Sequence, residues 1–185
     1  MIGIVLAGGQ SLRFGRDKAT CQLPGQKYSN VQLAVNKLSA CEQIIVCANR
    51  ANQGKIKSQL GSGITIVCDL AEYANHGPLA AIATATSLRT GDVDYQMLPV
   101  DYPNLTPATV NRIADQPNTV AATVGHTHYT IAHFRCSHRQ VVNWLAHGDW
   151  RLRHFIIDCC HCQPLLFPDS HEFINLNYDQ GEHIP

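Results

Sequence analysis

The sequence IGIVLAGGQSLRFGRDK, residues 2–18, decides the fold. It begins with an apolar run that ends at the adjacent glycines Gly8 and Gly9. A short apolar run closed by glycines is typical of a buried strand of a parallel sheet that ends in a loop. The loop has little bulk and carries Arg13 and Lys18. Backbone N–H groups beside glycine can approach a ligand closely, and the two cations can neutralise negative charge, so the stretch predicts a cradle for a nucleoside triphosphate.

Two other glycine-rich phosphate motifs do not fit this spacing. The dinucleotide fingerprint is G-x-G-x-x-G, whereas the glycines here are adjacent and then widely spaced. The P-loop needs G-x-x-x-x-G-K-[ST], but Gly15 is followed by Arg16 and Asp17, and Ala19 stands where the metal-binding hydroxyl belongs. The alternative interpretation is an ordinary strand-to-loop turn whose basic side chains are solvated.

Composition predicts one globular domain over residues 1–185. A hydrophobic content of 45% with 15% charged residues suits a buried sheet and excludes a disordered chain. The 14 basic and 14 acidic residues cancel, so we expect neither nucleic acid nor an anionic membrane as a partner. No stretch approaches the roughly 18 apolar residues of a membrane span.

The cysteines predict buried thiols in a reducing compartment. Several of the 8 cysteines lie inside apolar runs. Because Met1 leads directly into the first strand, we expect no signal peptide and a cytoplasmic location. The segment DCCHC, residues 158–162, invites a zinc interpretation, but neighbours in an extended chain point to opposite faces and no C-x-x-C or H-x-x-x-H partner lies nearby. We therefore expect no metal there.

Strand and helix patterns alternate along the chain. Apolar and β-branched runs predict strands, and helical spacing after a capping residue such as Ser29 or Thr106 predicts helices. The expected strands are residues 2–7, 43–48, 64–68, 94–100, 119–124, 129–134 and 173–177. The expected helices are residues 29–40, 54–60, 106–113 and 137–147, with a further helix that has Pro78 in its first turn. This alternation predicts a three-layer α/β/α domain with a mostly parallel sheet and a site across its carboxyl edge.

Polar side chains directly follow three of these strands. They are Asn49, Asp69 and Asp101, and for each a turn or helix-cap role is the alternative. Asp69 is level with the phosphate loop and is a candidate to accept hydrogen bonds from a nucleotide or to help position a metal. A carboxylate at the end of a central strand, facing a triphosphate, is placed to hold Mg²⁺. Asp101 is therefore the candidate metal ligand.

The sequence LAGGQSLRFGRDKA resembles the signature of the molybdenum cofactor guanylyltransferases, within the wider nucleotidyltransferase family. Further segments resemble elements of the same family: ANR at 48–50, NHGPLAAI at 75–82, DYPNL at 101–105, HYTIAHFR at 128–135 and FINLN at 173–177. Three positions depart from the family pattern. Ala81 replaces a glycine, Tyr129 replaces a proline, and YDQ at 178–180 replaces Thr-Pro-Glu.

The resemblance implies a Rossmann-like nucleotidyltransferase domain. In the implied reaction the terminal phosphate of molybdopterin attacks the α-phosphate of GTP, pyrophosphate leaves, and no covalent enzyme intermediate forms. Arg13 and Lys18 would stabilise the triphosphate, and Asp101 would hold the Mg²⁺ cofactor. The implied nucleotide-binding residues are Leu6, Ala7, Gly8, Lys18, Asn49, Asp69 and Asp101. GTP and a molybdopterin-type cofactor are the expected partners of a monomer that makes transient contacts with cofactor-handling proteins.

Three other functions stay open. One is a cytidylyltransferase acting on molybdopterin or on a sugar or polyol phosphate, although such relatives usually read L-A-A-G where Gly8 stands. Another is a nucleotide-binding protein without catalysis, which Ala81 and the altered end after FINLN keep open and which the intact Lys18 and Asp101 oppose. The third is a purely structural α/β domain, which the charged residues at two strand ends disfavour.

Overall fold

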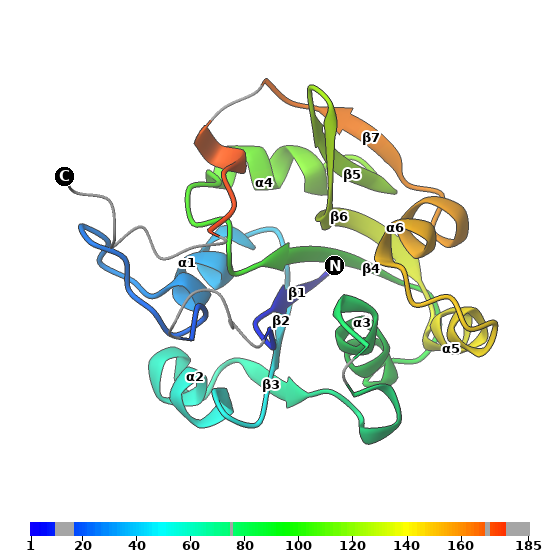
Figure 1. The fold of residues 1–185 in the computed structure, drawn as a ribbon, viewed down its shortest axis with the longest axis horizontal. Helices are drawn as coiled ribbons and strands as arrows, with labels where there is room; N and C mark the ends of the chain where they lie inside the picture. Colours follow the sequence, from blue (N-terminus) through cyan, green and yellow to red (C-terminus); the bar gives the residue numbers. More distant parts are fainter. Residues whose placement is uncertain (10–16, 75, 169–170, 177–185) are drawn as a thin grey trace.

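A single seven-stranded sheet organises the computed structural model, which describes residues 1–9, 17–74, 76–168 and 171–176 (Figure 1). The strand order is β3-β2-β1-β4-β6-β5-β7. The strands are β1 (Ile2–Leu6), β2 (Gln43–Ala48), β3 (Thr65–Cys68), β4 (Val93–Pro99), β5 (Thr119–Thr123), β6 (His126–Cys136) and β7 (Gln163–Leu166). Only β6 runs against its neighbours β4 and β5, and the other described strands share one direction. The mostly parallel α/β sheet is therefore confirmed.

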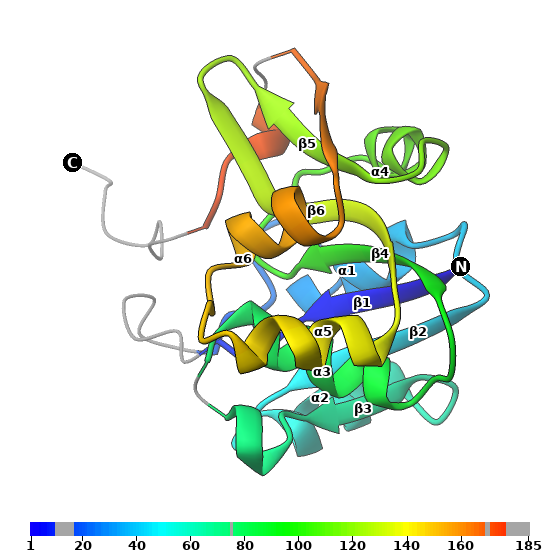
Figure 2. The ribbon, with the colours of Figure 1, turned by 90° about the vertical axis from the view of Figure 1, so that its right-hand side faces the viewer.

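Helices cover both faces of this sheet, as Figures 1 and 2 show. One face carries α1 (Asn30–Lys37), α2 (Gln53–Leu60) and α4 (Pro107–Ala114), and the other carries α3 (Pro78–Ser87), α5 (His138–Ala146) and α6 (Leu152–His154). Three short turns complete the elements: η1 (Ala71–Tyr73), η2 (Phe155–Cys159) and η3 (His171–Phe173). Among the described residues, no helix is both long and apolar enough to cross a bilayer.

The continuous apolar runs of the strands follow from these two layers. Ile4 of β1 packs into the cluster shared with α3 and α5, whereas its neighbour Val5 packs into the cluster shared with α1 and α4. Both side chains are fully buried. Each such burial stabilises the fold by about 1.5–3 kcal/mol, and a strand covered on both faces needs apolar residues at every position.

The predicted helix starts are confirmed where a cap was named. Ser29 N donates to Gln32 Oε1 at 2.9 Å in a capping box that begins α1. Thr106 Oγ1 accepts from Thr109 N at 3.2 Å and begins α4. Such caps satisfy N–H groups that the helix itself leaves unpaired, and each contributes about 1 kcal/mol.

The predicted terminal strand at residues 173–177 is wrong over its described part. The chain there leaves η3 and makes no strand pairing. Phe173 is buried with its ring 4.8 Å from that of His128, and Leu176 N donates to Asp101 O at 2.9 Å. The two buried residues of the described segment, Phe173 and Leu176, are three positions apart and Ile174 is exposed, so the segment is anchored on the core at two points and does not form a pleated strand.

The cysteine segment also differs from expectation. It was expected to be extended, but its first two residues, Asp158 and Cys159, end the π-helical turn η2, in which Cys160 N donates to Phe155 O at 2.9 Å. The argument that neighbouring side chains of an extended chain point to opposite faces therefore does not hold for these residues. Among the described residues, no group of three or more His, Cys, Asp or Glu could hold a metal. All eight thiols are free and most are buried, and burial raises the pKa of Cys162 to about 12.

Phe173→Ala should lower the free energy of unfolding by about 3–5 kcal/mol, because removing a buried ring leaves a cavity. Ile174→Ala is the matched control, since its side chain is 49% exposed against 8% for Phe173, and we expect a change within about 0.5 kcal/mol. Urea unfolding followed by circular dichroism measures both. Equal effects of the two substitutions would contradict the packing of η3 on the core.

Candidate functional site

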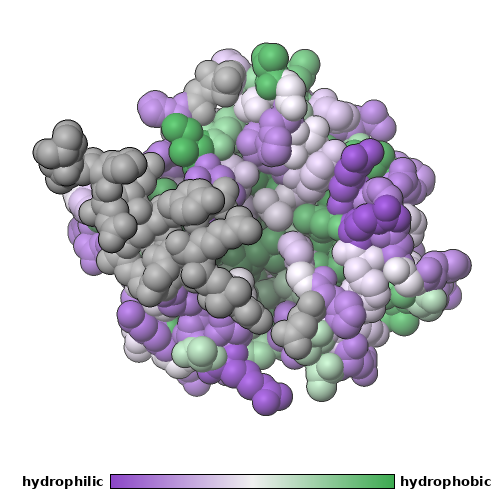
Figure 3. Space-filling view, in the orientation of Figure 1, coloured by the Kyte–Doolittle hydropathy of each residue, from purple (hydrophilic) through white to green (hydrophobic). Residues whose placement is uncertain are grey.

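The carboxyl ends of β1, β2, β3 and β4 meet at one edge of the sheet. In the parallel register Leu6 pairs with Cys47 of β2 and with Pro99 of β4, and Ala48 pairs with Cys68 of β3. Figures 1 and 2 together show that these strands end toward the viewer of Figure 1. Figure 3 has the same orientation and shows apolar surface in the middle of this face. The predicted residues that follow these strands at this edge are Gly8, Asn49, Asp69 and Asp101.

Leu6 and Ala7 belong to the sheet as much as to the loop. Val100 N donates to Leu6 O at 3.2 Å, and Ala7 N donates to Cys47 O at 2.8 Å. Ala7 O in turn accepts from Asn52 Nδ2 at 2.8 Å. These three backbone groups are therefore engaged within the protein, and contact of Leu6 or Ala7 with a nucleotide stays a prediction.

Gly8 and Gly9 present the next two N–H groups. Neither donates a hydrogen bond to another described residue. A Cβ on Gly8 would lie 3.4 Å from the carbonyl of Ala48, which is a tight contact, whereas a Cβ on Gly9 would meet no atom within 4 Å. Successive N–H groups without bulky side chains suit the oxygens of an anion, so this turn is where a phosphate group would bind.

Asn49, Asn52 and Asp17 hold both ends of the glycine loop, which is the segment from Gly8 to Asp17. Asn49 Nδ2 donates to Gly8 O at 3.2 Å, and Asn49 Oδ1 accepts from Asn52 N at 2.9 Å. Asn52 Nδ2 donates to Ala7 O and to Asp17 Oδ2, each at 2.8 Å. Because Asn52 is only 4% exposed, these hydrogen bonds form a largely buried brace, which ties Ala7 and Gly8 to Asp17.

The brace contains one residue that was predicted for the site, Asn49, and two that were not, Asn52 and Asp17. Asn49 makes the turn contacts that were its alternative role, and its contact with a nucleotide stays a prediction. Asn52 and Asp17 were missed by the sequence reasoning. The available signal was the spacing of Asn49 and Asn52, which places a second amide one turn into the connection to α2.

Asp101 lies in the turn after β4 and meets side chains from both ends of the chain. Its Oδ2 accepts from Asn175 Nδ2 at 3.0 Å and lies 3.9 Å from Lys18 Nζ. Its Oδ1, like Oδ1 of Asn175, is buried without a hydrogen-bond partner in the described part of the chain. Burial raises the pKa of the Asp101 carboxyl, against the hydrogen bond from Asn175 and the charge of Lys18, which both lower it.

The two unpaired oxygens fit a hard cation. A buried acceptor without a partner costs free energy, and a cation bound by the Asp101 carboxylate would remove that cost for its Oδ1. Mg²⁺ takes oxygen ligands, and proteins commonly supply one or two carboxylates while substrate phosphates and water supply the rest. Asp101, with Asn175 beside it, would hold such an ion. Asn175 was missed as a site residue, although it lies in the apolar-polar alternation of FINLN.

The remaining predicted residues stand as follows. Asp69 follows β3 and is partly buried, which raises the pKa of its carboxyl. Its carboxylate accepts no hydrogen bond from the described residues, so it is available to a ligand. Arg13 lies outside the described residues, and its role stays a prediction.

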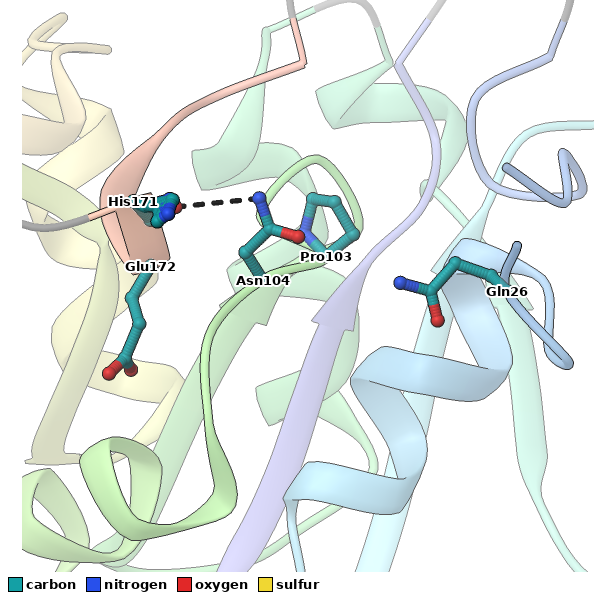
Figure 4. A pocket seen from close by; sticks show the side chains of 5 residues that line it. All are labelled: Gln26, Pro103, Asn104, His171 and Glu172. Carbon is teal, nitrogen blue, oxygen red and sulfur yellow. Dashed lines mark hydrogen bonds between the residues drawn. The ribbon is translucent and has the colours of Figure 1, made fainter. Parts of the chain in front are cut away.

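A pocket of about 410 Å³ lies beside the Asp101 turn (Figure 4). Its lining residues are Gln26, Pro103, Asn104, His171 and Glu172. Asn104 Nδ2 donates across it to His171 O at 3.4 Å. None of the predicted site residues lines this pocket. The strand-end residues, rather than this pocket, therefore form the candidate site.

Comparison with known proteins identifies the family and the fold of the chain. The family model of the MobA-like NTP transferase domain matches residues 3–165. A probable molybdenum cofactor guanylyltransferase of Mycobacterium tuberculosis is 30% identical over 100% of this chain and 92% of its own length. Among solved structures, a nucleotidyl transferase from Methanothermobacter thermautotroptrophicus matches with a TM-score of 0.70 and 18% identity, covering 96% of this chain and 92% of that one. The molybdopterin-guanine dinucleotide biosynthesis protein A from Archaeoglobus fulgidus matches with a TM-score of 0.65 and 16% identity, covering 96% and 93%.

Asp101→Asn should raise the free energy of unfolding at neutral pH by about 0.5–2 kcal/mol, because it replaces a largely buried carboxylate with a neutral amide of the same shape. The pKa of this carboxyl is higher in the folded protein than in the unfolded chain. The free energy of unfolding of the wild type therefore falls as the pH rises from the unfolded-state pKa to the folded-state pKa, and the destabilisation is complete above the folded-state pKa. The gain should therefore shrink in acid, where the wild-type carboxyl is neutral. Urea unfolding from pH 4 to 7 measures this. A variant less stable than the wild type at neutral pH would contradict the account.

Proposed function

The chain belongs to the MobA-like NTP transferase domain family, and we propose that it transfers GMP from GTP to the terminal phosphate of a molybdopterin-type cofactor, with release of pyrophosphate. The observation that carries the proposal is the Lys18–Asp101 pair, with an unpaired Asp101 oxygen, beside the open Gly8 and Gly9 N–H groups. A cation, a metal-binding carboxylate and an anion-binding turn are what a triphosphate substrate requires. Relatives named as probable molybdenum cofactor guanylyltransferases, which this chain matches over 92% of their length, support a guanylyl group as the group transferred and the molybdenum cofactor as the acceptor.

Each part of the site has a distinct task in this reaction. The Gly8 and Gly9 N–H groups would bind phosphate oxygens, and Lys18 would neutralise charge that grows on the leaving pyrophosphate. Asp101 would hold Mg²⁺ with Asn175 beside it. Bound Mg²⁺ supplies further neutralisation of the triphosphate. Arg13 is proposed to add a second cation, and Asn49 and Asp69 to complete the nucleotide pocket.

The bond changes need no covalent intermediate. An oxygen of the acceptor phosphate attacks the α-phosphorus of GTP and forms the new P–O bond. The bond from the α-phosphorus to the oxygen that bridges to the β-phosphate breaks, and its electron pair leaves with pyrophosphate. Because the second pKa of a phosphate monoester is about 6, the attacking oxygen is already unprotonated at neutral pH. The chain therefore has to position and neutralise rather than to remove a proton.

The nearest rival is a CTP-dependent enzyme of the same family, and nucleotide binding separates the two. We expect GTP with Mg²⁺ to raise the melting temperature, and CTP, ATP and UTP to raise it much less. A hundredfold excess over Kd adds about 2.7 kcal/mol, or roughly 5–10 °C for a chain of this size. A shift confined to GTP supports the proposal, and a Mg²⁺- and molybdopterin-dependent release of pyrophosphate from GTP would then test the transfer itself. A shift confined to CTP, or none with any nucleotide, would overturn it.

Lys18→Ala should weaken GTP binding about 10- to 100-fold, since a hydrogen bond to a charged group is worth about 1.5–3 kcal/mol. The preference for guanine should not change, because an ammonium that binds phosphate does not read the base. Lys55→Ala is the control, as this lysine is exposed on α2. Calorimetric titration with GTP and CTP measures both affinity and preference. Altered base preference in Lys18→Ala would contradict the phosphate-binding role.

A further inference from the structure

A buried lysine that takes no part in the reaction above lies beneath the Asp101 turn. Lys37 closes α1 and is only 7% exposed. Its Nζ donates to Tyr102 O at 3.1 Å and to Pro103 O at 2.7 Å. Burial lowers the pKa of Lys37 to about 8, against the charge of Glu172, which raises it. An ammonium group is costly to bury, so its place here needs a reason.

The lysine hydrogen-bonds one short segment of backbone. The two carbonyls that it contacts belong to the first and second residues after Asp101. It reaches them from α1, the first helix after the glycine loop, across 65 and 66 residues of sequence. An ammonium at a helix end commonly bonds the last carbonyls of that helix, whereas Lys37 crosses to a different connection. It therefore ties the β1–α1 half of the site to the turn that carries the carboxylate.

The same turn is held from its other side by the C-terminal segment. Leu176 N donates to Asp101 O at 2.9 Å. Glu172 Oε2 accepts from Thr106 N at 3.0 Å and from Thr106 Oγ1 at 3.1 Å, at the start of α4. Figure 4 shows Glu172 and His171 on one side of the pocket and Gln26 on the other, with Pro103 and Asn104 between them. With these contacts present, Lys37 fixes the part of the turn between Asp101 and α4.

We propose that Lys37 is a positioning residue, which sets the Asp101 carboxylate for Mg²⁺ and the triphosphate by holding the carbonyls of Tyr102 and Pro103. The inference rests on the proposed function, because it assigns the purpose of a contact in that site. Groups that orient a metal ligand commonly change metal affinity 10–100-fold when they are removed. A lysine with a purely structural role would change the melting temperature and leave the Mg²⁺ requirement unchanged.

Lys37→Met keeps an unbranched side chain one atom shorter than lysine and removes its donors. We expect the Mg²⁺ concentration that gives half of the GTP-induced stabilisation to rise roughly tenfold. GTP binding measured in EDTA should stay at the wild-type value, because the glycine loop and Lys18 are unchanged. Lys57→Met is the matched control, since Lys57 is exposed on α2 and should show the wild-type Mg²⁺ dependence. Thermal-shift and calorimetric titrations of the full chain measure both quantities.

The outcomes separate the two proposals. If the wild type responds to Mg²⁺ and GTP and Lys37→Met needs the same Mg²⁺ concentration, the positioning role is overturned and the proposed function stands. If the wild type shows no such response, the proposed function is overturned and this inference with it. Lys37→Gln, whose shorter side chain still ends in N–H donors, should show an intermediate Mg²⁺ requirement. If Lys37→Met does not fold, Lys37→Gln is used in its place. A wild-type Mg²⁺ dependence of Lys37→Gln would then overturn the inference.

Discussion

The parallel pairing of β1 between β2 and β4 is the constraint on which the rest of the structure depends. Its register places Leu6 level with Cys47 and Pro99, so the three strands end together. The hydrogen bonds continue one step past the strands, from Ala7 N to Cys47 O and from Val100 N to Leu6 O. The residues that follow are thus delivered to one edge by the ladder itself. The candidate site is a consequence of where parallel strands must stop, as in other open α/β sheets.

Beyond that edge, the protein buries polar groups that a core alone would not contain. Asn52, Lys37 and Asp101 are buried or largely buried, and each is a polar or charged side chain. The cost of burying Asn52 is offset by its hydrogen bonds in the brace around the glycine loop. The cost of burying Lys37 is offset by its hydrogen bonds to two backbone carbonyls. Asp101 keeps one oxygen unpaired. A fold selected only for stability would fill these positions with apolar residues, so their presence at one edge indicates a site that exchanges stability for binding.

Much of this could be predicted from the sequence, for identifiable reasons. A strand buried on both faces reads as an unbroken apolar run, so β1 and β2 were correctly located, and polar residues just past such runs are fixed at the carboxyl edge by topology. FINLN misled because an irregular segment laid over a core also mixes apolar and polar residues: Phe173 and Leu176 are buried, whereas Ile174 between them is exposed. The segment DCCHC misled because nothing in it signals a π-helical turn. β7 was missed because it is a short edge strand containing Pro164, a residue that cannot donate to a ladder.

The site itself was predictable only where a residue's position along the chain fixes its position in space. Lys18 and Asp101 meet that condition, and the structure brings them to 3.9 Å. Asn175 and Lys37 do not, because their contacts depend on how a distant segment and a helix end pack against one turn. Three side chains from different parts of the chain contact residues 101–103: Lys18 and Asn175 contact Asp101, and Lys37 contacts the two residues after it. The Asp101 turn is therefore held by contacts from both the first and the last described segments of the fold, so the geometry of the site depends on how both of them pack.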